Sequence, residues 1–180
     1  GKINLTYGNI GVGSTDGGTN SNGIYLVSTT DGGTGTDEAK IIDTTINVNT
    51  PDRTDPNTVR QASNNGIYIG GGRTISEITR SIINVNGNTA GDNNNIGIVV
   101  GNTSTQAKIT KTENLTITLD TTNAKSDTNG TGIYMYNGDV TLGKATKLTG
   151  TGGDDVFVTI RNRDYTNTLT MDGDTGSGNS

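Results

Sequence analysis

A five-residue phrase recurs four times along this chain and constrains its fold more than any other feature. In each copy a glycine precedes an apolar residue, then usually a tyrosine, then a second apolar residue. The copies are Asn22–Leu26 (NGIYL), Asn65–Ile69 (NGIYI), Ile96–Val100 (IGIVV) and Thr131–Met135 (TGIYM). The glycines are 43, 31 and 35 residues apart. Repeats at this range indicate stacked structural units that bury a shared core.

A second phrase alternates apolar, polar and apolar residues, which is the period of a half-buried strand. Its five copies are Ile3–Leu5, Ile46–Val48, Ile83–Val85, Ile117–Leu119 and Val158–Ile160. A third, weaker element follows each tyrosine phrase, at Ala39–Ile41, Arg73–Ile75, Ala107–Ile109 and Ala145–Leu148. The three phrases alternate in a fixed order, so we expect three short strands in each repeat.

This pattern predicts an all-β fold, a right-handed parallel β-helix of about 4–5 coils with essentially no α-helix. Residues 1–180 would form a single β-helix segment of a longer polypeptide, with residues 171–180 as a polar tail. The glycine of each tyrosine phrase would make a corner of the coil. An antiparallel sandwich or barrel is the alternative, but it predicts strands every 8–12 residues in no fixed order.

Stacking brings equivalent residues of successive coils to about 4.8 Å from each other. The inward columns that we expect are Ile3, Ile46, Ile83, Ile117 and Val158; Leu5, Val48, Val85, Leu119 and Ile160; Ile24, Ile67, Ile98 and Ile133; and Leu26, Ile69, Val100 and Met135. Only 28% of the chain is hydrophobic, and a narrow solenoid core explains how so few apolar residues can suffice.

The residue types that are missing exclude several functions. The chain has no Cys and no His, which removes thiolate metal sites and the commonest general base. Its net charge of -5 argues against nucleic-acid binding, which needs clustered Lys and Arg. We therefore predict no nucleic-acid partner, no metal and no cofactor. A calcium loop at 172–177 is disfavoured, because the acidic residue that closes an EF-hand loop is missing.

The repeat phrases and the composition together resemble the passenger domains of type V autotransporters, most closely the large fusobacterial autotransporter adhesins. The resemblance covers nearly the whole chain and is carried by the Gly-Ile-Tyr copies, by Ile-Asn-Val-Asn at 46–49 and 83–86, and by the richness in Thr, Asn and Gly without Cys. It implies a β-helix displayed on the bacterial cell surface and anchored in the outer membrane by a C-terminal translocator barrel of the full-length protein. It also implies adhesion to host cells or other bacteria through a glycan or protein receptor.

The tyrosines are the first candidate contact residues. If Ile24 and Leu26 face inward, Tyr25 faces outward by alternation. The same argument aligns Tyr68, Val99 and Tyr134 on one face, with Tyr136 two residues farther on. An exposed aromatic row can pack against sugar rings or a protein partner, and its alternative is a ladder of stacked side chains that supports the coils.

Further candidates lie outside that face. The segment 49–65 is a long loop whose charged residues Asp52, Arg53, Asp55 and Arg60 are a candidate contact site, because binding often resides on loops. An outward column of polar residues, either a hydrogen-bonded ladder or a site for polar ligands, is expected at Asn4, Asn47, Asn84, Thr118 and Thr159.

Two other functions remain open. One is a polysaccharide-active enzyme, for which Asp154 and Asp155 would be the paired carboxylates, with Arg161, Arg163 and Asp164 nearby. Because adjacent residues of a strand face opposite sides, solvated loop charge explains this pair better, and we predict no enzyme. The other is a structural spacer in a stalk. Exposed strand edges at the ends of the solenoid predict self-association.

Overall fold

The structure of the chain is a computed structural model that describes residues 2–6, 9–13, 20–27, 38–50, 63–70, 72–87, 94–120, 130–150, 156–161 and 166–172. These residues form β-strands joined by turns and short links, and none of them is helical. The described part of the chain therefore holds no helix that could cross a membrane.

Three parallel sheets make the walls of the coil. Sheet A contains β1 (Lys2–Thr6), β4 (Glu38–Ile42), β7 (Thr74–Thr79), β10 (Ala107–Ile109), β14 (Gly138–Gly143) and β17 (Asn167–Asp172), with β11 (Thr112–Glu113) paired to β7. Sheet B contains β2 (Asn9–Gly13), β5 (Thr45–Thr50), β8 (Ile82–Gly87), β12 (Thr116–Asp120) and β15 (Lys147–Gly150). Sheet C contains β3 (Asn20–Leu26), β6 (Ser63–Ile69), β9 (Asn94–Val100), β13 (Thr131–Met135) and β16 (Val156–Ile160).

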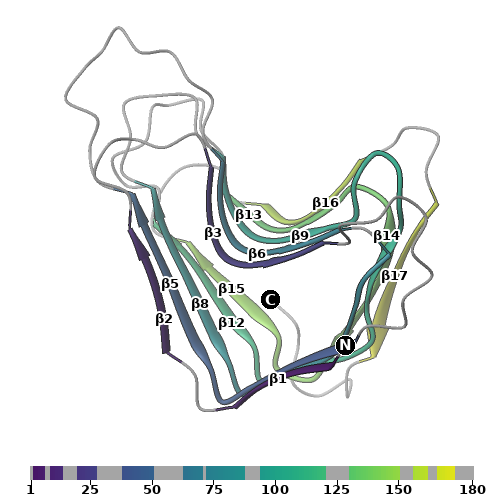
Figure 1. Cartoon of the computed structure of the whole chain (residues 1–180), viewed down its shortest axis with the longest axis horizontal. Coiled ribbons are helices and arrows are strands. Elements are labelled where there is room, and N and C mark those ends of the chain that lie inside the picture. The colour runs from purple at the N-terminus through teal and green to yellow at the C-terminus, as the bar shows by residue number, and fades with distance from the viewer. Residues whose placement is uncertain are drawn as a thin grey trace, which may run out of the picture.

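The chain passes through sheets A, B and C in turn and then starts the next coil. Figure 1 shows the coils winding clockwise as they recede from the viewer, which is the right-handed sense and the usual one for parallel crossovers. Every pairing between strands is parallel. The predicted parallel β-helix with three strands per coil is confirmed, and β17 begins a further coil after the fifth.

Isoleucine columns fill the space between the sheets. The register aligns Ile46, Ile83 and Ile117 of sheet B. It likewise aligns Ile67, Ile98 and Ile133 of sheet C. All six side chains are 0% exposed. Fully burying one such side chain contributes about 1.5–3 kcal/mol, so the repeated isoleucines are the main source of the fold's stability.

The column prediction is wrong at the N-terminal end. The phrase Ile3–Leu5 lies in β1 of sheet A and pairs with Ala39–Ile41, not with Ile46–Val48. In sheet B, the residues of the preceding coil that pair with Ile46 and Val48 are Ile10 and Val12 of β2. Alternating apolar residues suit all three sheets equally, so the alternation alone does not specify which sheet a strand joins.

The prediction is also wrong at the C-terminal end. The phrase Val158–Ile160 belongs to sheet C, where it pairs with Ile133–Met135 and places Thr159 beside Tyr134. Ala145–Leu148 does not continue the third element. Its last two residues open β15 of sheet B, where Leu148 pairs with Ile117. The partner of Ala107–Ile109 in sheet A is instead Gly138–Val140.

A corner with a left-handed residue joins sheet A to sheet B. Asp43, Arg80, Asn114 and Ala145 occupy equivalent corners with φ of 49°, 47°, 48° and 53°. The interstrand hydrogen bonds continue through these corners: the amide of Asp43 donates to the carbonyl of Thr79 at 3.0 Å, with equivalent bonds from Arg80 and Asn114. The two sheets therefore form one continuous ladder of backbone hydrogen bonds.

Candidate binding groove

The strands of sheet C bend along their length and give this wall of the coil a concave outer surface (Figure 1). A glycine stands at the centre of each of the first three strands, and Gly132 is the second residue of the fourth. A Cβ on Gly66 would collide with Ile83 of sheet B and lie 2.6 Å from the carbonyl oxygen of Gly97. A Cβ on Gly23 or Gly97 would likewise collide with an isoleucine of sheet B and with the carbonyl oxygen of the bend glycine in the next coil. The repeated glycine is thus required because sheets B and C approach each other closely at this bend.

The bend also changes which residues face outward. The position occupied by a Cβ on Gly66 points toward sheet B, and the next residue, Ile67, is also in the core. Strict alternation is therefore interrupted, and Asn65 lies on the outer side. In the next coil Ile96 takes the equivalent outer position, paired with Asn65.

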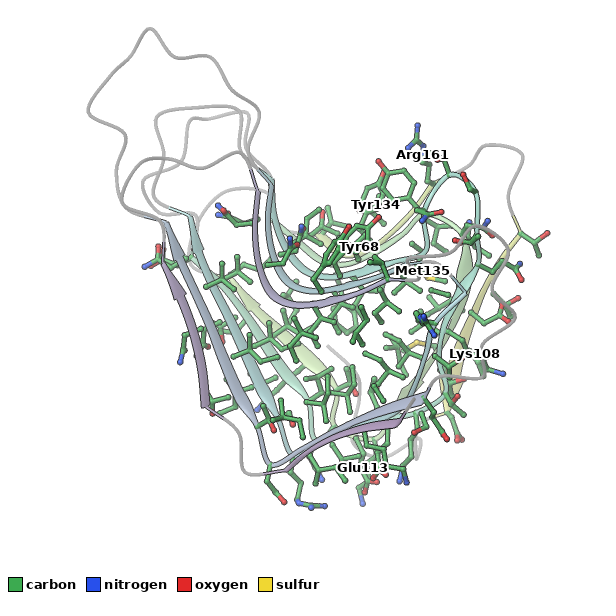
Figure 2. The ribbon with its side chains drawn as sticks, in the orientation of Figure 1. Tyr68, Lys108, Glu113, Tyr134, Met135 and Arg161 are labelled. Atoms are coloured by element: carbon green, nitrogen blue, oxygen red, sulfur yellow. The ribbon has the colours of Figure 1, made fainter. Side chains whose placement is uncertain are left out.

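The tyrosines lie in the concavity of sheet C. Tyr25 stacks on Tyr68 with ring centroids 5.1 Å apart and an angle of 26° between the rings. Val99 pairs with Tyr68 on one side and with Tyr134 on the other, as the alignment predicts. Figure 2 shows Tyr68 and Tyr134 pointing to the outer, concave side of the sheet, whereas Met135 points into the coil.

A second aromatic pair lies at the C-terminal end of the row. The rings of Tyr134 and Tyr136 are 4.8 Å apart and tilted by 52°. The guanidinium carbon of Arg161 lies 4.5 Å from the centroid of the Tyr136 ring, within the range of a cation–π contact. Arg161 therefore packs at the edge of the aromatic row.

These side chains enclose a groove of about 460 Å³, which we call the tyrosine groove. It is lined by aromatic and aliphatic residues and by short polar residues. The lining is Tyr25, Tyr68, Tyr134, Tyr136, Ile96, Val99, Asn22, Asn65, Asn102 and Thr103. Its volume falls within the range of small-ligand sites, about 300–1,000 Å³.

Asn65 places an unsatisfied acceptor at the groove. Its side-chain nitrogen donates to Oδ1 of Asn22 at 2.8 Å, while its own Oδ1 is buried without a hydrogen-bond partner. The residue is 5% exposed. The amide ladder stops here because Ile96, the next residue of the column, cannot donate. Leaving a buried acceptor unpaired costs about 1–3 kcal/mol.

Asn102 is held in a fixed orientation just after β9. Its Oδ1 accepts hydrogen bonds from the backbone amides of Ser104 and Thr105 at 2.8 and 2.9 Å. It also accepts one from the Thr105 hydroxyl at 3.0 Å. This local turn is of the kind that asparagine side chains form with nearby backbone. Because the oxygen is engaged, the Nδ2 group is the end that remains available as a donor.

Burial raises the pKa of two groove tyrosines further above neutral pH. Loss of solvation raises the pKa of Tyr68, and the nearby Tyr25 and Tyr136 raise it further. Loss of solvation is also the main reason why the pKa of Tyr134 is raised. Both groups therefore remain phenols at neutral pH, and their hydroxyls can donate as well as accept hydrogen bonds.

The structure brings together four of the eight predicted contact residues, the tyrosines at 25, 68, 134 and 136. The other four, Asp52, Arg53, Asp55 and Arg60, lie outside the described residues. Of the proposed carboxylate cluster only Arg161 is described, and it packs on Tyr136.

Sequence reasoning missed the contributions of Asn65, Ile96 and Asn102 to the groove. The signal for Asn65 was its place directly before the bend glycine. No local pattern marks Asn102 as a groove residue, because its position depends on the coil that follows.

Elsewhere the outward amides form a ladder, as one of the two interpretations predicts. Asn84 donates from Nδ2 to Oδ1 of Asn47 at 2.8 Å. Asn4 and Thr159 do not belong to this column, because they pair with Lys40 and Tyr134. Among the described residues no cluster of three or more Asp or Glu side chains is placed to hold a metal ion.

Comparison with known proteins gives no match: no family model, no curated protein and no solved structure matches this chain.

Proposed function

We propose that this chain is a segment of a bacterial surface adhesin, in which the β-helix is a scaffold and the outer face of sheet C is the contact surface. The observation that carries the proposal is the tyrosine groove itself. Its four tyrosines come from the first, second and fourth coils and gather on one concave face. Tyrosine is enriched at recognition surfaces because it combines a large apolar ring with a polar end.

The resemblance of the repeats to autotransporter adhesins supports the same proposal. Asn22–Leu26 and its copies carry that resemblance, and these segments form the floor of the groove. The lack of cysteine suits a polypeptide that crosses an oxidising periplasm. Display at the cell surface, with anchoring in the outer membrane, is part of the proposal.

The lining of the groove favours binding over catalysis. Hydrolysis of a glycosidic bond usually needs two carboxyl groups that flank that bond. The described lining residues include no Asp and no Glu, so the described part of the groove offers neither the acid nor the nucleophile or base of such a site.

Adhesion can be tested with the purified chain, fluorescently labelled, on epithelial cells and on bacteria from a mixed community. We expect saturable binding that falls at least tenfold in the double variant Tyr68→Ala and Tyr134→Ala. Lys108→Ala is the matched control, because Lys108 is exposed on the outer face of sheet A. Circular dichroism and thermal melts establish that each variant is folded.

The proposal fails if the folded wild-type chain binds no cell, a result that would favour a stalk spacer. It also fails for this face if the double variant binds as well as Lys108→Ala. Release of shortened sugars from a polysaccharide by the wild-type chain would favour the enzyme instead.

A further inference from the structure

The aromatic row of the tyrosine groove has one aliphatic residue at its centre. The outward column reads Tyr25, Tyr68, Val99 and Tyr134 in consecutive coils. Tyr68 and Tyr134 are two ladder steps apart, about 9.6 Å. The side chain between them is Val99, which lines the groove and is 3% exposed. The column therefore has one aliphatic step in an otherwise aromatic row.

The groove is also elongated. Its lining residues on β3, β6, β9 and β13 belong to four successive coils, which at the ladder spacing span about 14 Å. An aromatic pair stands at each end: Tyr25 with Tyr68, and Tyr134 with Tyr136. An occupant that contacts both pairs must be longer than a single ring.

Polar groups at the groove are arranged for a ligand that both donates and accepts hydrogen bonds. The buried Oδ1 of Asn65 lacks a donor. The Nδ2 of Asn102 is an available donor, because the other end of the amide is fixed by the turn. A hydroxyl group of a ligand can donate to the Asn65 oxygen or accept from the Asn102 nitrogen, since each hydroxyl both donates and accepts.

Among the described residues, the lining contains no Asp, Glu, Lys or Arg. Arg161 packs beside it, over the ring of Tyr136. A charged ligand would lose its hydration without gaining a counter-charge within the groove. The uncharged lining therefore favours a neutral ligand.

We propose that the tyrosine groove binds a neutral oligosaccharide, with one pyranose ring seated over Val99 between Tyr68 and Tyr134. The C–H faces of the sugar pack against the electron-rich faces of the tyrosine rings. Its hydroxyls pair with the amides of Asn65 and Asn102. This inference rests on the proposed adhesive function and names the class of receptor that the same face would take.

The tyrosines supply a direct readout of binding. The chain has six Tyr and no Trp, and four of the six line the groove. We would titrate the chain with glucose-, galactose-, mannose- and N-acetylglucosamine-based oligosaccharides of one to four residues, following tyrosine fluorescence. Saturation-transfer NMR on the same samples identifies the sugar protons that contact the protein.

We expect at least one of these neutral series to bind. Within it a trisaccharide should bind at least tenfold more tightly than its monosaccharide, because it contacts both aromatic pairs. A sialylated form that carries its carboxylate over Val99 should bind more weakly than its neutral parent.

Two variants test the seat of the ring. Val99→Tyr completes the aromatic column and adds a ring where the sugar ring would lie, so it should weaken sugar binding at least tenfold. Asn102→Asp retains the oxygen that accepts the three turn hydrogen bonds but replaces the donor, and should weaken binding about tenfold, the factor that corresponds to one lost hydrogen bond. The control is Thr118→Ala, on the outer face of sheet B.

The outcomes separate this inference from the adhesive function. If the folded wild-type chain binds cells but none of the neutral sugars, the sugar site is refuted while adhesion stands. If a tyrosine-rich peptide binds in the groove and the sugars do not displace it, the receptor is a peptide and the inference is wrong. Equal sugar affinity in wild type, Val99→Tyr and Asn102→Asp would place the sugar elsewhere and refute it as well. Sugar binding without cell binding would instead overturn the proposed adhesion.

Discussion

At the scale of single residues, the glycine of the repeated phrase has the most demanding environment. It stands where sheet C bends and where sheet B comes close, so that even a methyl group has no space. The tyrosine two residues after it is under no such constraint, because it faces the outer side. The phrase therefore combines a residue that the fold requires with a residue that the fold leaves free for contact.

Gly66→Ala should strongly destabilise the chain. The added Cβ would collide with Ile83 and approach the carbonyl oxygen of Gly97 to 2.6 Å. Because backbone is involved, neither obstacle can move easily, and we expect a loss of about 3 kcal/mol or more in the free energy of unfolding. Urea denaturation followed by circular dichroism measures it.

Gly70→Ala is the matched control for this substitution. The atoms nearest its Cβ would be side-chain atoms, of Tyr68 and Asn102 at 3.1 and 3.2 Å, so a shift of a few tenths of an ångström relieves the contact. We expect a loss of less than about 1.5 kcal/mol, within the range of tolerated core substitutions. Equal losses in the two variants would contradict the steric argument for the bend.

At the scale of elements, the corner between sheets A and B sets the relative direction of two walls of the coil. A left-handed residue in each corner turns the chain while the interstrand hydrogen bonds continue. Arg80 at one corner also forms an ion pair with Asp43 of the preceding coil, with nitrogen and oxygen 2.7 Å apart. Both residues of this pair are partly exposed, so we attribute the geometry of the corner to the backbone.

Ala145→Gly should stabilise the chain. Alanine carries a Cβ and is strained at φ 53°, and glycine adopts this conformation without that penalty. We expect a gain of up to about 1 kcal/mol in a thermal or urea melt, reduced by the greater freedom of glycine in the unfolded chain. Asn114→Gly at the equivalent corner should gain less, because asparagine tolerates the left-handed region. A larger gain at Asn114 than at Ala145 would count against this explanation.

The sequence predicts the central coils well because their phrases are matched in composition and order. Ile46, Ile83 and Ile117 align as expected, and so do Tyr68, Val99 and Tyr134. The predictions for Ile3–Leu5 and Val158–Ile160 are wrong because the alternation of apolar and polar residues is the same in all three sheets and does not identify the sheet. The polar part of the groove escaped prediction for a different reason. The outward turn of Asn65 depends on the interrupted alternation at Gly66, which only the packing of sheet B against sheet C produces.

At the scale of the whole molecule, the described coils stack without closing on themselves. The outermost strands of sheets B and C, β2 with β15 and β3 with β16, each have a partner on one side only among the described strands. Backbone groups along such edges are available to pair with another chain.

We expect the 180-residue polypeptide to self-associate through these edges. Light scattering and sedimentation over a range of concentrations would show a rise in mean mass. The Arg161 amide donates to Met135 of β13, so the preceding amide, that of Ile160, faces the free edge of β16. Ile160→Pro removes this edge donor and should reduce the association. A mass that stays monomeric at high concentration would contradict free edges.

The stacking of coils has a mechanical consequence for a polypeptide under tension. The hydrogen bonds between coils point along the axis of the solenoid, so a pull on one terminus loads the outermost coil before any other. Each coil that peels away releases the 31 to 43 residues that separate successive bend glycines, or roughly 100–150 Å of extended chain at about 3.4 Å per residue. Under flow, a surface protein built this way would lengthen in steps and dissipate work, while the coils still wound keep the tyrosine groove intact.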